Sequence, residues 1–454
     1  MSTQSSAVPY DWGDDQASLA ERLRPPGNVI EIARTLQNAG YEAWCVGGAV
    51  RDALLGHEHL DWDLATSARP EQVRKLFKRT IPVGIEFGTV GVLDRDGVMH
   101  EVTTFRRDVQ TDGRHAVVEF GASLDDDLAR RDFTINAIAW DPIAKVLRDP
   151  FHGRQDLARA VVRAVGVARE RLIEDRLRAL RAIRFASRFD FTLDDATWNA
   201  VVESAPFLTR LSPERVKQEL EKTLEQAILP SRAFMRWRDA GAFASVIPAL
   251  ASISNVQLRS VDALPRPVLR TRPLRKSLRL AALFAGLEGK TAEHALRALR
   301  FPNLEIGVVG SLVDRWFRLR SELTERLTKS SPSALDSAYL RRLAADVGRT
   351  RVSGFVRLAA SQWHASQQVE PAQVRELYRA LVHTAFHDPI EIGDLALDGD
   401  DLRRMGISPG PALGRTLQVL MAYVIEDPSR NTYDTLRMYV EQLRGTAPSN
   451  GEIA

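Results

Sequence analysis

The sequence predicts an α+β protein in which a small head of mixed strands and helices precedes a long helical part. Residues 28–165 show both strand and helix patterns. Beyond about residue 166 the strand patterns vanish, and apolar residues recur at the three- and four-residue spacing of amphipathic helices. At 454 residues the chain is too long for one ordinary core, so we expect roughly two to four domains.

The elements of the head follow from local signals. A helical pattern ends at Gly40, a residue type that often terminates helices, and a later helix enters through Pro70, which is favoured in a first turn. The turn residues DRDG join the last two strands into a hairpin. The expected helices are 29–40, 49–56 and 70–77, and the expected strands are 41–48, the segment around 61–63, 87–93 and 98–105.

The composition is that of a globular protein in a reducing compartment. The chain is 44% hydrophobic and 27% charged, and no apolar run approaches the roughly 20 residues of a membrane span. Residues 1–27 start without the pattern of a signal peptide, and we expect a disordered tail there. The single cysteine, Cys45, allows no internal disulfide, which favours the cytoplasm. The net charge is only +3, but arginines cluster locally, which allows a nucleic-acid partner.

Two acids flank Trp62 in the segment HEHLDWDLAT, residues 57–66. Side chains two residues apart on a strand lie on the same face, about 7 Å from each other. Adjacent carboxylates repel one another unless a cation lies between them, so Asp61 and Asp63 are candidate metal ligands. An acidic turn, or an edge strand protected against aggregation, is the alternative explanation.

A glycine-rich turn precedes these acids. In VGGAVRD, residues 46–52, a strand breaks at Gly47 and Gly48 and a helix begins, so backbone N–H groups face the turn and a phosphate can approach closely. Arg51 adds a cation. Two glycines in such a turn are common, but together with two nearby acids they indicate a phosphate site beside a divalent metal, as nucleotidyl transfer requires. Glu101, on an expected strand, is either a third carboxylate of this site or a solvent-facing acid.

The segment ARRDFTINAIAW, residues 129–140, places charged and amide side chains next to an apolar run. Arg130 and Arg131 could hold a phosphate, and Asp132 or Asn136 could hold a ribose hydroxyl. A charged helix end explains this segment equally well when it is considered alone.

Asp175, Arg178, Arg181 and Arg184 recur every three residues in EDRLRALRAIRF, residues 174–185. A solvated face of salt bridges is the usual explanation for such a pattern. However, Asp175 can only accept hydrogen bonds and Arg178 can only donate them. Cytosine and adenine both present an amino donor beside a ring-nitrogen acceptor, whereas uracil and guanine present the reverse. This pair would therefore accept C and A without a template.

These segments together resemble the motifs of class II tRNA nucleotidyltransferases, the family of CCA-adding enzymes and bacterial poly(A) polymerases. GGAVRD with DWD resembles the metal motif, RRDFTINA the ribose motif and EDRLRALRAIRF the base-selecting motif. DPFHGRQDL, residues 149–157, resembles the hinge motif, and SPERVKQEL, residues 212–220, the neck motif. The resemblance is close over about residues 28–225 and partly returns at 395–421, which resembles the tail segment of the family.

The resemblance implies a polymerase-β-like nucleotidyltransferase head and an all-helical neck, body and tail that hold the acceptor arm of tRNA, with CTP and ATP as substrates. The divisions are 1–27 for the N-terminal tail, 28–165 for the head, 166–230 for the neck with the base-reading helix, 231–330 for the body and 331–454 for the tRNA-binding tail. Mg²⁺ is the implied cofactor, held by Asp61 and Asp63, with Glu101 as a further catalytic candidate. The residues expected to contact the nucleotide are Gly47, Gly48, Arg51, Arg131, Asp132, Asn136, Asp175, Arg178, Arg181 and Arg184.

Two alternatives to CCA addition stay open. The first is a poly(A) polymerase or a relative that adds only CC or only A, and the second is an inactive RNA-binding protein, which the intact acids and arginines argue against. Residues 105–120 look slightly shorter than the flexible loop of typical CCA-adding members, and a shorter loop would favour an enzyme that adds CC without the final A. Gly113 is a candidate pivot in this segment. No membrane contact is expected, and the sequence leaves the oligomeric state open.

Overall fold

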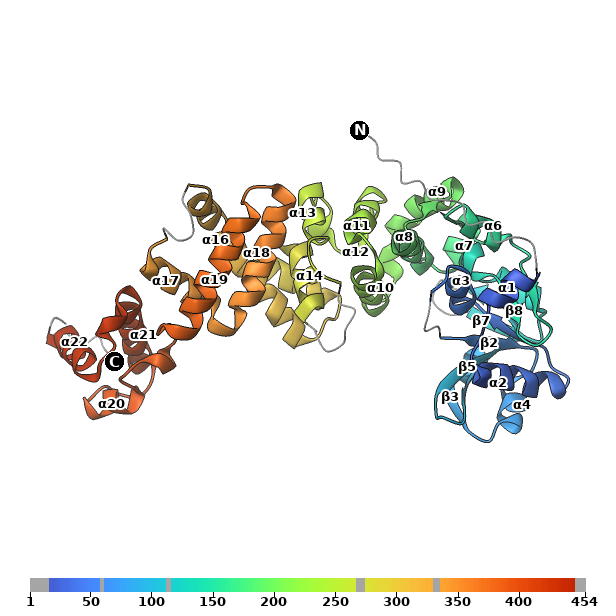
Figure 1. Ribbon diagram of the computed structural model, residues 1–454, viewed down its shortest axis with the longest axis horizontal. Coiled ribbons are helices and arrows are strands. Elements are labelled where there is room, and N and C mark those ends of the chain that lie inside the picture. The colour runs from blue at the N-terminus through green and yellow to red at the C-terminus, as the bar shows by residue number, and fades with distance from the viewer. Residues whose placement is uncertain (1–15, 58–60, 112–115, 267–273, 330–334, 446–454) are drawn as a thin grey trace. The chain divides into compact units, whose positions relative to one another are not determined.

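The computed structural model describes residues 16–57, 61–111, 116–266, 274–329 and 335–445 (Figure 1). The contacts between residues divide the chain into two compact units, residues 1–251 and 252–454. The first unit holds the sheet and the first group of helices, and the second is helical. The predicted α+β class is therefore confirmed, while the divisions expected at residues 166, 231 and 331 stay predictions.

A seven-stranded mixed sheet forms the centre of the head, with the strand order β3-β4-β5-β2-β1-β8-β9. Strands β2 and β5 run parallel, with Leu64 beside Val102, and the other neighbouring pairs run antiparallel. This register brings the start of β2 next to Glu101 on β5. The strands are β1 Ala43–Val46, β2 Asp63–Thr66, β3 Thr80–Gly84, β4 Thr89–Leu93, β5 Met99–Thr104, β8 Ala139–Asp141 and β9 Val146–Arg148.

Helices α2 and α4 pack against this sheet (Figure 1). Their buried residues recur at helical spacing, as Val29, Ile32 and Leu36 do on α2 and Val73 does on α4, which is why the pattern of the sequence predicted both helices. The helices of the head are α1 Gln16–Arg22, α2 Gly27–Asn38, α3 Gly48–Leu54, α4 Pro70–Leu76, α5 Leu124–Ala129 and α6 Gly153–Ala158.

Three features of the first unit differ from the sequence prediction. Within the expected disordered tail, Gln16–Arg22 forms helix α1, because Leu19 and Leu23 lie one turn apart and are both buried. The segment expected as a loop at 105–120 contains paired strands, β6 Arg106–Thr111 and β7 Ala116–Phe120, while Gly113 lies outside the described residues. Beyond residue 166, β11 Thr192–Leu193 pairs in parallel with β10 Val161–Val162.

The rest of the first unit is a group of helices packed around α8. Helix α8 contacts both α10 and α11 and buries one broad face, which includes Leu180 and Ile183. The helices are α7 Ala168–Glu174, α8 Leu177–Phe189, α9 Asp195–Ser204, α10 Pro213–Gln226, α11 Pro230–Asp239 and α12 Ala242–Val246.

The second unit consists of helices α13 to α22. Trp316 on α16 and Trp363 on α18 pack edge to face with their ring centroids 5.5 Å apart, and the Trp363 indole donates a hydrogen bond to Thr324. No helix among the described residues is long and apolar enough to cross a membrane. The helices are α13 Asn255–Ser260, α14 Leu274–Phe284, α15 Gly289–Ala298, α16 Asn303–Lys329, α17 Ser337–Val347, α18 Val352–Ser366, α19 Pro371–His387, α20 Gly399–Arg404, α21 Pro411–Glu426 and α22 Tyr433–Gly445.

Helix α6 approaches the turn at residues 134–136 so closely that we expect only glycine to fit at position 153. A Cβ added at Gly153 would lie 2.2 Å from the backbone carbonyl oxygen of Thr134. Gly153→Ala should therefore lower the free energy of unfolding by about 1–3 kcal/mol, since the overlap is with backbone and not with a flexible side chain. Urea unfolding measures the effect.

The matched control is Gly27→Ala. Gly27 is also the first residue of a helix, and nothing lies within 4 Å of its added Cβ. Equal unfolding midpoints for the two variants would contradict the tight contact at Gly153.

Candidate active site

The two aspartates lie at the start of strand β2, in the middle of the sheet. The strand expected around both acids begins only at Asp63, and Asp61 precedes it. Trp62 between them is buried and anchors the segment. Asp63 is half-buried and Asp61 is exposed, and neither makes a hydrogen bond or an ion pair among the described residues.

Glu101 lies beside Asp63 on the neighbouring strand β5. Burial, followed by the charges of Glu101 and Asp61, raises the pKa of Asp63 to about 7, so the carboxylates crowd one another. Within the described part of the chain, however, no three Asp, Glu, His or Cys side chains are close enough to hold one ion together. The arrangement therefore fits a divalent cation on Asp61 and Asp63 whose remaining ligands come from water and a bound phosphate, which is the usual manner of Mg²⁺ binding.

Gly47 permits a close contact with Arg131. Its φ is 74°, a left-handed conformation that favours glycine, and a Cβ there would lie 2.8 Å from Nη1 of Arg131. Arg131 also donates to Asp127 at 3.1 Å, while its buried Nε has no hydrogen-bond partner in the described structure. Gly48 begins α3 directly afterwards. The glycine pair thus leaves room for a guanidinium beside the start of α3.

A buried chain of polar contacts connects α3 to the turn at residues 134–136. Arg51 is only 3% exposed, lies over the rings of Phe185 and Phe189, and donates to the Asn136 side chain. Asn136 in turn donates to Oδ1 of Asp132 at 2.8 Å. The predicted contact residues from two separate sequence segments therefore form one network.

Asp132 connects this network to helix α8. Nε and Nη2 of Arg181 donate to its Oδ2 at 2.8 and 2.6 Å. Burial raises the pKa of Asp132, but the charge of Arg181 and the hydrogen bonds from Asn136 and Arg181 outweigh it and lower the pKa to about 2. Asp132 is therefore a fixed anion at neutral pH.

The two residues expected to recognise the base are both held by protein partners. Asp175 lies between α7 and α8, and its Oδ2 accepts from Nη2 of Arg215 on α10 at 2.8 Å. Arg178 donates to Glu174 at 2.7 Å and to the backbone carbonyls of Arg171 and Arg130 at 2.8 and 3.0 Å. These partners fix the acceptor and the donor in place.

Arg184 has a structural partner. Its Nε donates to Glu219 on α10 at 2.7 Å, both side chains are almost fully buried, and Nη1 donates to Gln226 at 3.0 Å. Breaking a buried pair by removing one partner costs about 3–5 kcal/mol. Arg184 therefore secures α8 to α10.

Most of the predicted contact residues line one cavity of about 440 Å³ in the first unit. Asp61, Asp63, Glu101 and Gly47 are not among its lining residues. The predicted residues that it brings together are Gly48, Arg51, Arg131, Asp132, Asn136, Asp175, Arg178, Arg181 and Arg184, and Arg130 also lines it.

Sequence reasoning missed four lining residues, Phe185, Arg188, Lys222 and Gln226. Lys222 and Gln226 follow Glu219 by three and seven residues on α10, so helical spacing within residues 212–226 could have identified them. Arg188 donates to Asp52 at 2.9 Å, whereas Lys222 makes no ion pair with any described residue.

Two family models match the chain. Residues 43–163 match the poly A polymerase head domain, and residues 190–254 match the probable RNA and SrmB-binding site of polymerase A. These matches cover the sheet with its glycine turn and the helices that follow α8.

Relatives match over almost the whole length. A CCA-adding enzyme from Geobacillus kaustophilus is 36% identical over 94% of this chain and 100% of its own length. A CCA-adding enzyme from Limosilactobacillus fermentum is 35% identical over 89% of this chain and 94% of its own length. The crystal structure of the Bacillus stearothermophilus CCA-adding enzyme in complex with CTP has a TM-score of 0.71 at 32% identity, covering 93% of this chain and 99% of that one. The Thermotoga maritima CCA-adding enzyme complexed with tRNA shares the fold. Its TM-score is 0.65 at 20% identity, and the match covers 94% of this chain and 98% of that one. This chain therefore belongs to the family of CCA-adding enzymes, which are nucleotidyltransferases.

Proposed function

We propose that this protein adds C, C and A to the 3′ end of tRNA, using CTP and ATP as substrates and Mg²⁺ as cofactor, in the cytoplasm. The observation that carries the proposal is the cavity in which Asp175 and Arg178 lie with Asp132, Arg181 and Arg51. A single pocket with a fixed acceptor and a fixed donor can recognise both bases without a template.

Asp61 and Asp63 are the residues that would hold Mg²⁺. Their charges at the start of β2 fit a divalent cation better than a structural role, because neither side chain has a hydrogen-bond or ion-pair partner among the described residues, and burial and nearby acids raise the pKa of Asp63 despite the charges of Arg131 and His100. When bound, Mg²⁺ would neutralise charge on the triphosphate and on the attacking 3′ oxygen. The crowding by Glu101 adds to the attraction for a cation.

The arginines orient the rest of the nucleotide. Arg131 lies against the glycine turn and would bind phosphate oxygens, and the network of Asn136 and Asp132 would position the ribose. Asp175 would accept from the amino group of C or A, and Arg178 would donate to the ring nitrogen. Uracil and guanine would place a donor against Arg178 and an acceptor against Asp175, leaving both unpaired.

The direct test uses tRNAs that lack CCA, CA or A, each incubated with one nucleoside triphosphate at a time. We expect CTP to extend the first two and ATP to extend only the third. Addition of A without C, or failure to extend a tRNA ending in CC, would instead favour the poly(A) or CC-adding alternatives.

Loss of either aspartate should abolish the chemistry without unfolding the protein. Asp61→Ala or Asp63→Ala should lower the rate of nucleotide addition at least ~10³-fold, because a positioned metal contributes several kcal/mol to the transition state. The thermal unfolding midpoint should not fall, since each change removes one of several mutually repelling carboxylates. Single-turnover incorporation of CTP measures the loss.

The control is Glu86→Ala, which removes an exposed acid elsewhere in the head. A folded Asp61→Ala protein with near-normal activity would refute the metal site.

Arg215 should act as a positioning residue for base selection. Its 2.8 Å contact fixes Asp175, so Arg215→Ala should lower the preference for C over U by about tenfold, as expected for one charge-assisted hydrogen bond at a partly exposed site. The readout is the ratio of incorporated bases, which a general loss of stability would not move.

Arg215→Lys should restore part of that preference, because it returns the charge. An unchanged ratio in an active Arg215→Ala protein would show that Asp175 needs no support from α10.

A further inference from the structure

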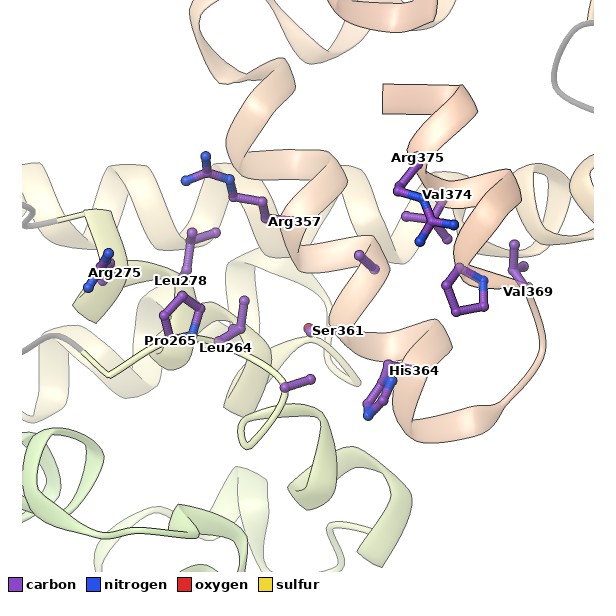
Figure 2. A pocket seen from close by; sticks show the side chains of 13 residues that line it. Leu264, Pro265, Arg275, Leu278, Arg357, Ser361, His364, Val369, Val374 and Arg375 are labelled. Carbon is purple, nitrogen blue, oxygen red and sulfur yellow. The ribbon is translucent and has the colours of Figure 1, made fainter. Parts of the chain in front are cut away.

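A second cavity, of about 470 Å³, lies within the second unit (Figure 2). It is as large as the cavity of the candidate active site and has the size of typical small-ligand pockets, about 300–1,000 Å³. Helices α14, α18 and α19 and the segment 263–265 form its walls. Its lining residues are Ala263, Leu264, Pro265, Arg275, Leu278, Arg357, Ala360, Ser361, His364, Val369, Pro371, Val374 and Arg375.

The walls combine an apolar floor with basic groups. Leu264, Leu278 and Val369 are buried and give the pocket its apolar floor, with Leu264 and Leu278 close to Pro265 and Val369 at the opposite end (Figure 2). Three arginines and a histidine are also present, and none of the described lining residues is acidic. The pocket therefore suits an anion that carries an apolar body.

Two of the three arginines of this pocket have no partner that compensates their charge. Arg357 and Arg375 make no hydrogen bond or ion pair with any described residue, and Arg275 donates only to the carbonyl of Arg266, at 3.2 Å. Several exposed arginines elsewhere in the second unit are paired, as in Arg318 with Asp314, Arg326 with Glu322, Arg342 with Glu426, Arg403 with Asp400 and Arg430 with Asp427, whereas Arg379 has no partner among the described residues.

The spacing along α18 places the polar groups on one side of the pocket. Arg357, Ser361 and His364 lie four and three residues apart on α18, so they share one helix face (Figure 2), and Ala360 falls on the same face by its spacing from Arg357 and His364. Ser361 donates its hydroxyl to the carbonyl of Leu358, at 2.7 Å, and its oxygen can still accept a hydrogen bond.

We propose that this pocket is a second nucleotide-binding site, which takes the base against the apolar floor and the phosphate on Arg357 and Arg375. A bare phosphate would not need the floor, and a purely apolar ligand would not need uncompensated guanidinium groups. An unstacked base with its phosphate matches both features, since bases stack on guanidinium planes and on aromatic rings such as the His364 imidazole, and also pack against apolar side chains.

The nucleotide can come from two sources with the same chemistry, a free mononucleotide or an unpaired nucleotide of the RNA substrate. Only the second source rests on the proposed function. Two binding measurements separate them: equilibrium dialysis with labelled AMP and CMP, which counts sites per chain, and the Kd for tRNA at fixed salt.

Three variants distinguish binding in the pocket from general attraction to basic residues. Arg357→Ala removes a phosphate contact from an exposed position, and Ala360→Phe fills the cavity while it leaves every arginine in place. Arg379→Ala is the matched control, because Arg379 lies one turn after Arg375 on α19, is exposed and unpaired among the described residues, and does not line the pocket.

We expect Arg357→Ala and Ala360→Phe to weaken binding about tenfold or more in one of the two measurements, the loss typical of one charged hydrogen bond, while Arg379→Ala changes neither. A lost second site in dialysis assigns the pocket to free nucleotides, and a weakened tRNA Kd alone assigns it to the RNA. Arg375→Ala repeats the test without filling the cavity, should Ala360→Phe fail to fold.

The proposal is overturned if Arg379→Ala weakens binding as much as Arg357→Ala, or if a folded Ala360→Phe protein binds normally in both measurements. Either result would show that Arg357 and Arg375 contact phosphates in general and do not form a nucleotide site. Equilibrium dialysis counts the nucleotide sites even if the protein extends no tRNA. Failure of the proposed function can therefore be distinguished from failure of the second nucleotide site.

Discussion

The ion pair between Asp132 and Arg181 connects the head to helix α8, and the geometry of the candidate site depends on it. One carboxylate oxygen of Asp132 accepts two hydrogen bonds from Arg181, and the other accepts from the Asn136 side chain and the backbone of Phe133. Since Asn136 also receives a hydrogen bond from Arg51, a single buried acid joins α3, the turn at residues 134–136 and α8. The residues that would contact phosphate, ribose and base therefore move as one body, which keeps their distances suited to one nucleotide.

Features that depend on neighbouring residues were predictable from the sequence. The glycine turn before α3 and the three-residue spacing of Arg178 and Arg181 on α8 express local geometry, because the period of a helix decides which side chains share a face. The same holds for α2 and α4, whose apolar residues recur with the helical period. Asp61 and Asp175 lie just before β2 and α8, so the period of these elements does not place them. The hairpin of β4 and β5 was also expected, because the turn residues DRDG lie between two strand patterns.

The partners of these side chains were not predictable, because spacing shows which residues share a face and not what that face meets. Arg184 lines the cavity, but its buried partner Glu219 is 35 residues away, and the spacing gave no sign of that pair. Asp175 and Arg215 are 40 residues apart and belong to different helices. The strands β6 and β7 gave no clear alternation of apolar and polar residues, so their hairpin was mistaken for a loop. Each of these contacts depends on long-range packing, which a single sequence specifies only through the completed fold.

The candidate site has a base side, formed by Asp175, Arg178 and Arg181, and a sheet side, formed by Asp61 and Asp63. The charges on the base side are paired with protein groups, whereas those on the sheet side are not. On the base side Asp175, Arg178 and Arg181 are already paired with protein groups, so their donors and acceptors need little reorganisation when a base arrives. On the sheet side Asp61 and Asp63 have no partner among the described residues, and the pKa of Asp63 shows that their charges repel. A cation alone would relieve this repulsion but would lack phosphate ligands, whereas a triphosphate alone would add negative charge beside two carboxylates. Under the proposed function, the charges on the sheet side would therefore be balanced only when the cation and the triphosphate are both present.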